Sequence, residues 1–113
     1  MNAQTLNALI KQSEQRRLEL RVQKGEEYTR GEEDVLSNFK RVGGGLHLTP
    51  LQVWWVYFHK HIDALASFIR TGKEASSESI EGRIDDLHVY LDLVYGLVNE
   101  EKERQKAINE ADF

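Results

Sequence analysis

Apolar residues recur at intervals of three and four positions through every long apolar segment of this chain, and no segment shows the alternation of a strand. The clearest case begins at Thr49 and Pro50, a good N-cap followed by proline at the first helical position. It continues to about Arg70, and Gly72 closes it. Its wide apolar face comprises Trp54, Tyr57, Phe58, His61, Leu65, Phe68 and Ile69. A face of this width is typical of the central helix of a bundle.

Three further helices are predicted. The first covers about residues 3–24, with Gly25 as its stop, and the second covers about 34–41, before the break at residues 43–45. The last covers about 78–104, and residues 105–113 form a charged tail that we expect to fray. Its core stripe is Ile80, Ile84, Leu87, Leu91, Val94 and Val98. Leu93 and Leu97 make a second strip, which indicates burial on two sides or a dimer contact.

The composition suits one globular domain that spans residues 1–113. Hydrophobic residues make up 40% of the chain and charged residues 30%, so a modest core can form. The net charge of −4 argues against a general nucleic-acid binder, and the absence of cysteine excludes a disulfide framework or thiolate chemistry. The polar start lacks a secretory pattern and no apolar run is long enough to cross a membrane. We expect a cytoplasmic protein.

An acidic run opens the last predicted helix. Glu78, Glu81 and Asp85 are three or four positions apart, so they can share one face of a helix, with His88 next in line. Asp86 and Tyr90 pair on a neighbouring face. Converging carboxylates would suit a divalent cation such as Mg²⁺ that holds phosphate groups. The competing interpretation is a solvated acidic face that confers solubility.

Other candidates lie on the third predicted helix. His61 falls within the apolar face, which predicts a buried histidine with one hydrogen-bond partner rather than a ligand. His59 and Asp63 are spaced as an exposed salt bridge or a metal pair. Lys60 is long enough to reach a phosphate, although alone it is an ordinary surface lysine. Trp55, at the edge of the face, is suited to stack on a base or to cover a dimer contact.

An ordered set of short motifs resembles the nucleotide-modification-associated domain of phages and bacteria, which we take to be akin to the all-α, MazG-like nucleoside triphosphate pyrophosphohydrolases. The resemblance covers about residues 21–100. Its motifs are Lys24, Glu27-Tyr28, Asn38-Phe39, Lys60, Glu78-Ser79-Ile80-Glu81, Asp86 and Tyr90. It implies an oligomeric all-α fold, a nucleotide pocket in which acidic residues hold Mg²⁺, and a role in phage or prophage nucleotide metabolism, hence in a host cytoplasm.

The chain departs from the family pattern at the metal site. MazG-like enzymes carry two acidic pairs on two helices, but here the third helix offers only Asp63 with His59, and Arg83 stands three positions before Asp86. Two explanations fit. The acids have moved to the run that begins at Glu78, or the protein binds a nucleotide without hydrolysing it, with Arg83 and Lys60 gripping phosphate.

The sequence therefore predicts a four-helix, bundle-like single domain that forms a homo-oligomer, with residues 1–24 in the oligomer contact. In the enzyme hypothesis the metal ligands are Glu78, Glu81, Asp85 and Asp86, while Lys60 and Arg83 neutralise developing charge. Tyr28, Asn38, Trp55 and Tyr90 would contact the nucleotide. The alternatives are a non-catalytic protein that sequesters a nucleotide or blocks a host protein, and a purely structural helical oligomer.

Overall fold

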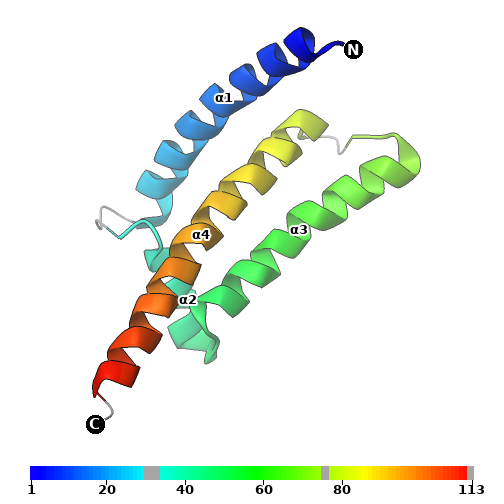
Figure 1. The fold of residues 1–113 in the computed structure, drawn as a ribbon. Coiled ribbons are helices and arrows are strands. Elements are labelled where there is room, and N and C mark those ends of the chain that lie inside the picture. Colours follow the sequence, from blue (N-terminus) through cyan, green and yellow to red (C-terminus); the bar gives the residue numbers. More distant parts are fainter. Residues whose placement is uncertain (30–33, 75–76, 112–113) are drawn as a thin grey trace.

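The computed structural model describes residues 1–29, 34–74 and 77–111, with the side chains of 24–29 excepted. The described residues form four helices and no strand, which confirms the predicted all-α fold (Figure 1). The helices are α1 (Ala3–Thr29), α2 (Ser37–Leu46), α3 (Pro50–Thr71) and α4 (Ile80–Ala111). Among these four helices, none combines the length and apolar composition needed to cross a bilayer.

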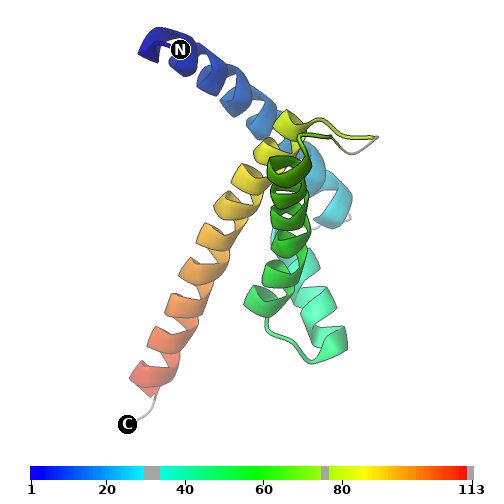
Figure 2. The same cartoon turned by 90° about the vertical axis from the view of Figure 1, so that its right-hand side faces the viewer.

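Helices α3 and α4 form an antiparallel hairpin, and the other two helices pack beside it. The short α2 lies on one side of the hairpin, and α1 runs in the same direction as α4, diverging from it toward the N-terminus (Figures 1 and 2). The molecule measures 58 × 31 × 28 Å, with a radius of gyration of 17.1 Å. A compact chain of this length has a radius of gyration of about 13 Å. The monomer is therefore elongated and open.

The core lies where α2 meets the hairpin. Its buried members are Leu36, Phe39, Val53, Trp54 and Leu97. The Phe39 ring packs against Tyr57 of α3 and Tyr90 of α4 at centroid distances of 6.2 and 6.4 Å. The indole Nε1 of Trp54 donates a hydrogen bond of 2.7 Å to the backbone carbonyl of Tyr90. This bond links α3 to α4 inside the apolar contact, where an unpaired indole N–H would be costly.

The limits of α3 match the sequence prediction at both ends. The Thr49 hydroxyl accepts the Gln52 N–H at 3.1 Å, and the Gln52 side chain accepts the Thr49 N–H at 2.9 Å, which together make a capping box. Gly72 ends the helix in the left-handed region, at φ 68°. Because caps depend on neighbouring residues alone, the local sequence is enough to predict them.

The predicted glycine stops at Gly25 and at residues 43–45 are wrong. Helix α1 passes through Gly25 and ends at Thr29, because an interior glycine costs a helix only about 1 kcal/mol. Residues 43–45 lie inside α2, which ends at Leu46. A Cβ on Gly43 would lie 2.5 Å from the Leu48 carbonyl oxygen. Glycine is therefore needed there for close approach of the following chain, and His47, at φ 57°, makes the turn instead.

Helix α4 starts later and ends later than predicted, and it buries only part of the predicted core stripe, including Leu87 and Val94. It begins at Ile80, so Glu78 precedes it, and it continues to Ala111. Fraying of residues 105–113 stays a prediction. The predicted second strip belongs to the core, with Leu97 3% exposed and Leu93 packed against the core cluster. Three members of the predicted core stripe are instead exposed, namely Ile84, Leu91 and Val98. The cause is tertiary, since α2 covers the Leu97 side of the helix.

Candidate functional site

The acidic run does not converge on one point. The Glu78 carboxylate lies 2.8 Å from Nε of Arg83, Glu81 is exposed, and Asp85 and Asp86 turn toward different helices. Within the described part of the chain, no group of three or more histidine, cysteine or acidic side chains could hold a metal ion. The convergence expected at Glu78, Glu81 and Asp85 is therefore absent, and Mg²⁺ binding stays a prediction.

Asp85 joins α4 to α1. It is 5% exposed, and its carboxylate accepts hydrogen bonds from Ser13 Oγ at 2.6 Å and Arg16 Nε at 2.8 Å. Burial alone would raise the pKa of this carboxyl group, but the hydrogen bonds from Arg16 and Ser13 outweigh burial and hold its pKa below the ordinary value. Asp85 is thus a structural anion, occupied by protein donors rather than by a ligand.

Sequence reasoning missed Ser13 and Arg16 as the partners of Asp85. The signal was present, because polar residues interrupt the apolar stripe of the first helix around Ser13, and Arg16 stands three positions later on the same face. A second ion pair lies further along both helices, where Arg21 Nη1 is 2.8 Å from Asp92 Oδ2. Both of its side chains are about half exposed, so it resembles an ordinary surface pair.

A buried polar cluster lies between α3 and α4. His61 is 7% exposed, as its place on the apolar face predicted. Its Nδ1 atom lies 3.8 Å from Oδ2 of Asp86, and its ring packs against Tyr90 at a centroid distance of 4.9 Å. Tyr90 also packs against Phe39 of the core. The predicted metal ligand Asp86 and the predicted nucleotide contact Tyr90 therefore both lie in the packing of the helix hairpin.

The remaining predicted residues lie apart from one another. Lys60 is exposed on α3, whereas the Arg83 side chain is only 16% exposed beside Glu78. The Asn38 amide oxygen, on α2, accepts a hydrogen bond from Arg41 at 2.7 Å. Trp55 is 54% exposed and its ring meets His59 edge-on at 4.3 Å. The side chain of Tyr28 lies outside the described residues.

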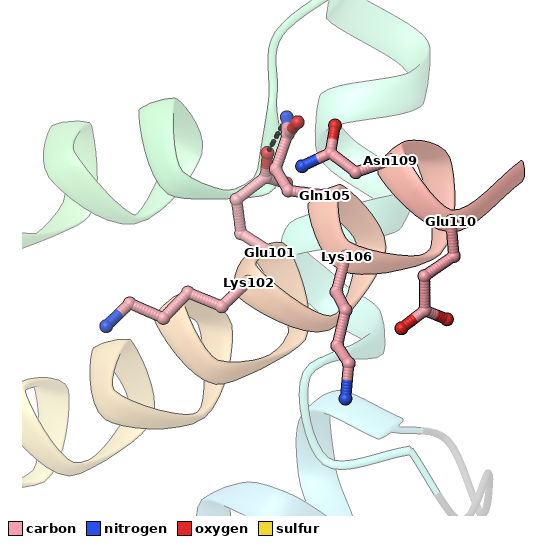
Figure 3. A pocket seen from close by; sticks show the side chains of 6 residues that line it. All are labelled: Glu101, Lys102, Gln105, Lys106, Asn109 and Glu110. Atoms are coloured by element: carbon pink, nitrogen blue, oxygen red, sulfur yellow. Dashed lines mark hydrogen bonds between the residues drawn. The ribbon is translucent and has the colours of Figure 1, made fainter. Parts of the chain in front are cut away.

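Hollows lie along α4 and between α3 and α4 in the described part of the chain. One of about 490 Å³ runs along the C-terminal part of α4 and is lined by Glu101, Lys102, Gln105, Lys106, Asn109 and Glu110 (Figure 3). All of these residues belong to one helix, so no second element closes it. Hydrogen bonds from Arg104 and Gln105 lower the pKa of Glu101 to about 2, because both stabilise its charged form. This carboxylate is already engaged within its own helix.

The other hollow, of about 220 Å³, lies where α3 meets the start of α4. Its lining includes Arg83 and Lys73 together with the acids Glu74 and Glu78. Pockets for small ligands are commonly 300–1,000 Å³, so this cavity is small and its charges are mixed.

Large apolar side chains are exposed on three helices of the described surface. On α3 they include Trp55, Val56, Ile62 and Ile69, at 54, 60, 39 and 75% exposure. On α4 they include Ile84, Leu91, Tyr95 and Val98, at 39, 49, 81 and 39% exposure. Helix α1 adds Leu6, Leu9, Ile10, Leu18 and Val22. Contiguous exposed apolar surface on a soluble protein marks an interaction site.

Comparison with known protein families, with curated proteins and with solved structures finds no match to this chain.

Proposed function

We propose that this chain is a non-catalytic helical protein that acts by associating with further copies of itself. The observation that carries this proposal is the balance of its apolar side chains. Among the described residues, seven hydrophobic side chains are buried, whereas eighteen large ones are exposed. Folding of the monomer therefore leaves many of its large apolar side chains partly in water, and association would remove them from it.

Helix α1 supports the same proposal. Its described side chains include no buried residue, and Leu6, Leu9 and Ile10 are each between 42 and 48% exposed. In folded proteins, packing of an apolar face supplies most of the stability of a helix, and intrinsic helix propensity supplies less. A contact with a second chain would supply packing that the monomer lacks. This agrees with the prediction that residues 1–24 take part in an oligomer contact.

Sedimentation velocity over a concentration series tests the proposal. The monomer mass is 13.1 kDa, and we expect the sedimenting species to have a multiple of that mass at micromolar concentration and to dissociate on dilution. The thermal midpoint should rise with protein concentration, because association is linked to folding. A single 13.1 kDa species at all concentrations, with a constant thermal midpoint, would overturn the proposal.

A nucleotide-directed function is a second proposal, and one observation favours it. The cavity of about 220 Å³ is lined by Arg83, Lys73 and Ser67, whose N–H and O–H groups are donors that could hold a phosphate. A thermal-shift panel of nucleotides, with and without Mg²⁺, separates the outcomes. A metal-dependent shift supports a pyrophosphohydrolase, and a metal-independent shift supports sequestration. The absence of any shift refutes both.

The matched variants for this second proposal are Arg83→Ala and Lys60→Ala. If Arg83 holds phosphate, its removal should weaken nucleotide binding by about 1.5–3 kcal/mol, the range for hydrogen bonds to charged groups. Lys60 lies exposed on α3 outside the cavity lining, so its removal should change binding little. Equal effects of the two variants would show that the cavity is not the site.

A further inference from the structure

We propose that the open face of the α3–α4 hairpin binds the same face of a second copy, so that two hairpins related by a twofold axis form a four-helix bundle. This inference rests on the proposed self-association and specifies its surface. The open face is defined here by Trp55, Phe58, Ile62, Leu65 and Ile69 of α3 with Ile84, His88, Leu91, Tyr95 and Val98 of α4.

The spacing of these residues is that of a helix-packing seam. On α3 the intervals between successive members are three, four, three and four residues, and all five side chains are apolar. On α4 the intervals are four, three, four and three residues, with His88 as the one polar member. Apolar residues that alternate at three and four positions form the seam along which helices of a coiled coil or bundle pack. The occupant expected of such a seam is therefore another helix.

Both seams lie on the side of the hairpin away from α2. On α3, Val53 and Tyr57 pack into the core around Phe39 of α2. Trp55, Ile62 and Ile69 are spaced seven residues apart, and around the helix axis they lie about a third to half a turn from Val53 and Tyr57. On α4, a Cβ at Gly96 would contact Leu36, and Leu97 is buried in the same core. The exposed residues Ile84, Leu91 and Val98 lie on another face of α4. The ribbon shows α2 on one side of the hairpin only (Figures 1 and 2).

The area of the open face matches that of a dimer interface. Seven of its members are exposed by 39–81%, namely Trp55, Ile62, Ile69, Ile84, Leu91, Tyr95 and Val98. At about 200 Å² for a large side chain, these fractions leave roughly 750 Å² of accessible surface. A specific interface buries about 800 Å² on each partner. One copy of the open face therefore supplies the area that a stable twofold contact needs.

The composition and width of the open face suit a second copy as its partner. The chain carries a net charge of −4, so two copies repel each other weakly at long range, and an uncharged contact surface adds no close pair of like charges to that repulsion. None of the ten members of the open face is aspartate, glutamate, lysine or arginine. The face is also two helices wide, and a twofold rotation brings a surface of the same width onto it, as an isologous contact requires.

The experiment compares glutamate substitutions on and off the open face by sedimentation equilibrium. Ile62→Glu and Leu91→Glu place a carboxylate in the proposed contact twice, once from each copy, and should weaken the dimer on the order of 100-fold or more. Val56→Glu is the control, since Val56 is 60% exposed on the same helix but lies on another side of it. The dissociation constant of the Val56→Glu dimer should equal that of the unmodified dimer. Leu9→Glu tests the rival surface on α1.

A cross-linking measurement keeps the inference testable if a glutamate variant fails to fold. The chain contains no cysteine, so a single introduced cysteine reports only its own position. With a short bismaleimide, Ile62→Cys and Leu91→Cys should give covalent dimers at dilute concentration, whereas Val56→Cys should not. Cross-linking at Val56 but not on the open face would overturn the inference.

The outcomes separate this inference from the proposed function. If the unmodified chain is a monomer, self-association itself fails. If it is a dimer that Ile62→Glu and Leu91→Glu leave intact, the open face is not the interface, although self-association stands. Dissociation by Leu9→Glu alone would place the contact on α1 and overturn the inference in the same way.

Discussion

The attachment of α1 to α4 should depend on the buried carboxylate of Asp85. We predict that Asp85→Asn releases α1 and that Asp92→Asn does not, although both acids belong to α4 and both pair with an arginine of α1. The two pairs have the same N–O distance of 2.8 Å, but the Asp85 side chain is 7% exposed and the Asp92 side chain is 50% exposed. The comparison therefore keeps the arginine pair and its distance constant, while Asp85 differs in its burial and in the additional hydrogen bond from Ser13.

The magnitude follows from the bonds that each acid accepts. A hydrogen bond to a charged group is worth about 1.5–3 kcal/mol, and Asp85 accepts from both Ser13 and Arg16. Asparagine retains one oxygen acceptor and Arg16 is half exposed, so water replaces part of the loss. We expect Asp85→Asn to cost about 2 kcal/mol in the contact of α1 with α4. Exposed pairs are worth about 0.2–1 kcal/mol, so Asp92→Asn should cost less than 1 kcal/mol.

Amide hydrogen exchange provides the assay, because it resolves local opening from global unfolding. In Asp85→Asn the amides of α1 should lose protection by about 2 kcal/mol, while those of α3 keep theirs. Equal loss in the two variants would refute the argument that burial and the Ser13 hydrogen bond make the Asp85 contact the stronger one. Loss of protection throughout the chain would refute the view that α1 is a separately releasable element.

Three further predictions concern residues outside the open face. Gly43→Ala should lower the free energy of unfolding, measured by urea denaturation, by more than about 1 kcal/mol, because its Cβ would lie 2.5 Å from the Leu48 carbonyl oxygen. In the control Gly44→Ala the new Cβ meets no atom within 4 Å, so the free energy of unfolding should stay the same or rise. Trp54→Phe should cost about 1–2 kcal/mol by the same measurement, because the carbonyl of Tyr90 loses its indole donor; an unchanged value would contradict a role for this bond. Folding lowers the pKa of Asp85 from 3.8, so the unfolded chain protonates this carboxylate at a higher pH than the folded chain does. The free energy of unfolding should therefore fall as the pH drops below about 4, and Asp85→Asn should reduce this acid destabilisation. Identical acid-unfolding profiles of the two chains would contradict the lowered pKa.

Local signals in the sequence were enough to predict α3. Thr49, Pro50 and Gln52 form the N-terminal cap from adjacent residues, and Gly72 adopts the left-handed conformation that ends the helix. The burial of His61 also followed from its place on a wide apolar face. Each of these predictions needed only the period of one helix.

Tertiary contacts decided the features that the sequence did not reveal. Gly43 permits a close approach of the chain near Leu48 rather than breaking the helix, and nothing in the local pattern distinguishes these two roles. On α4, two strips were apolar, and only the position of α2 determined that Leu97 is buried and Leu91 is exposed.

The acidic run shows the same limit at the candidate site. Helical spacing gives the direction of each carboxylate around α4 but not the element that faces it. Asp85 meets α1 and Asp86 meets His61 of α3, so residues that are adjacent in sequence serve different helix contacts. Ser13 and Arg16 are 72 and 69 positions from Asp85, and single-helix periodicity carries no information on such pairings.

The most direct measurement of the central claim is an isotope-filtered NMR experiment on an equal mixture of labelled and unlabelled chain. It detects only protons that are close between two copies. Self-association through the open face predicts intermolecular contacts between the methyl groups of Ile62 and Leu91 and the aromatic rings of Trp55 and Tyr95 in the second copy. Intermolecular contacts confined to α1, or none at concentrations where the chain is fully associated, would contradict the account.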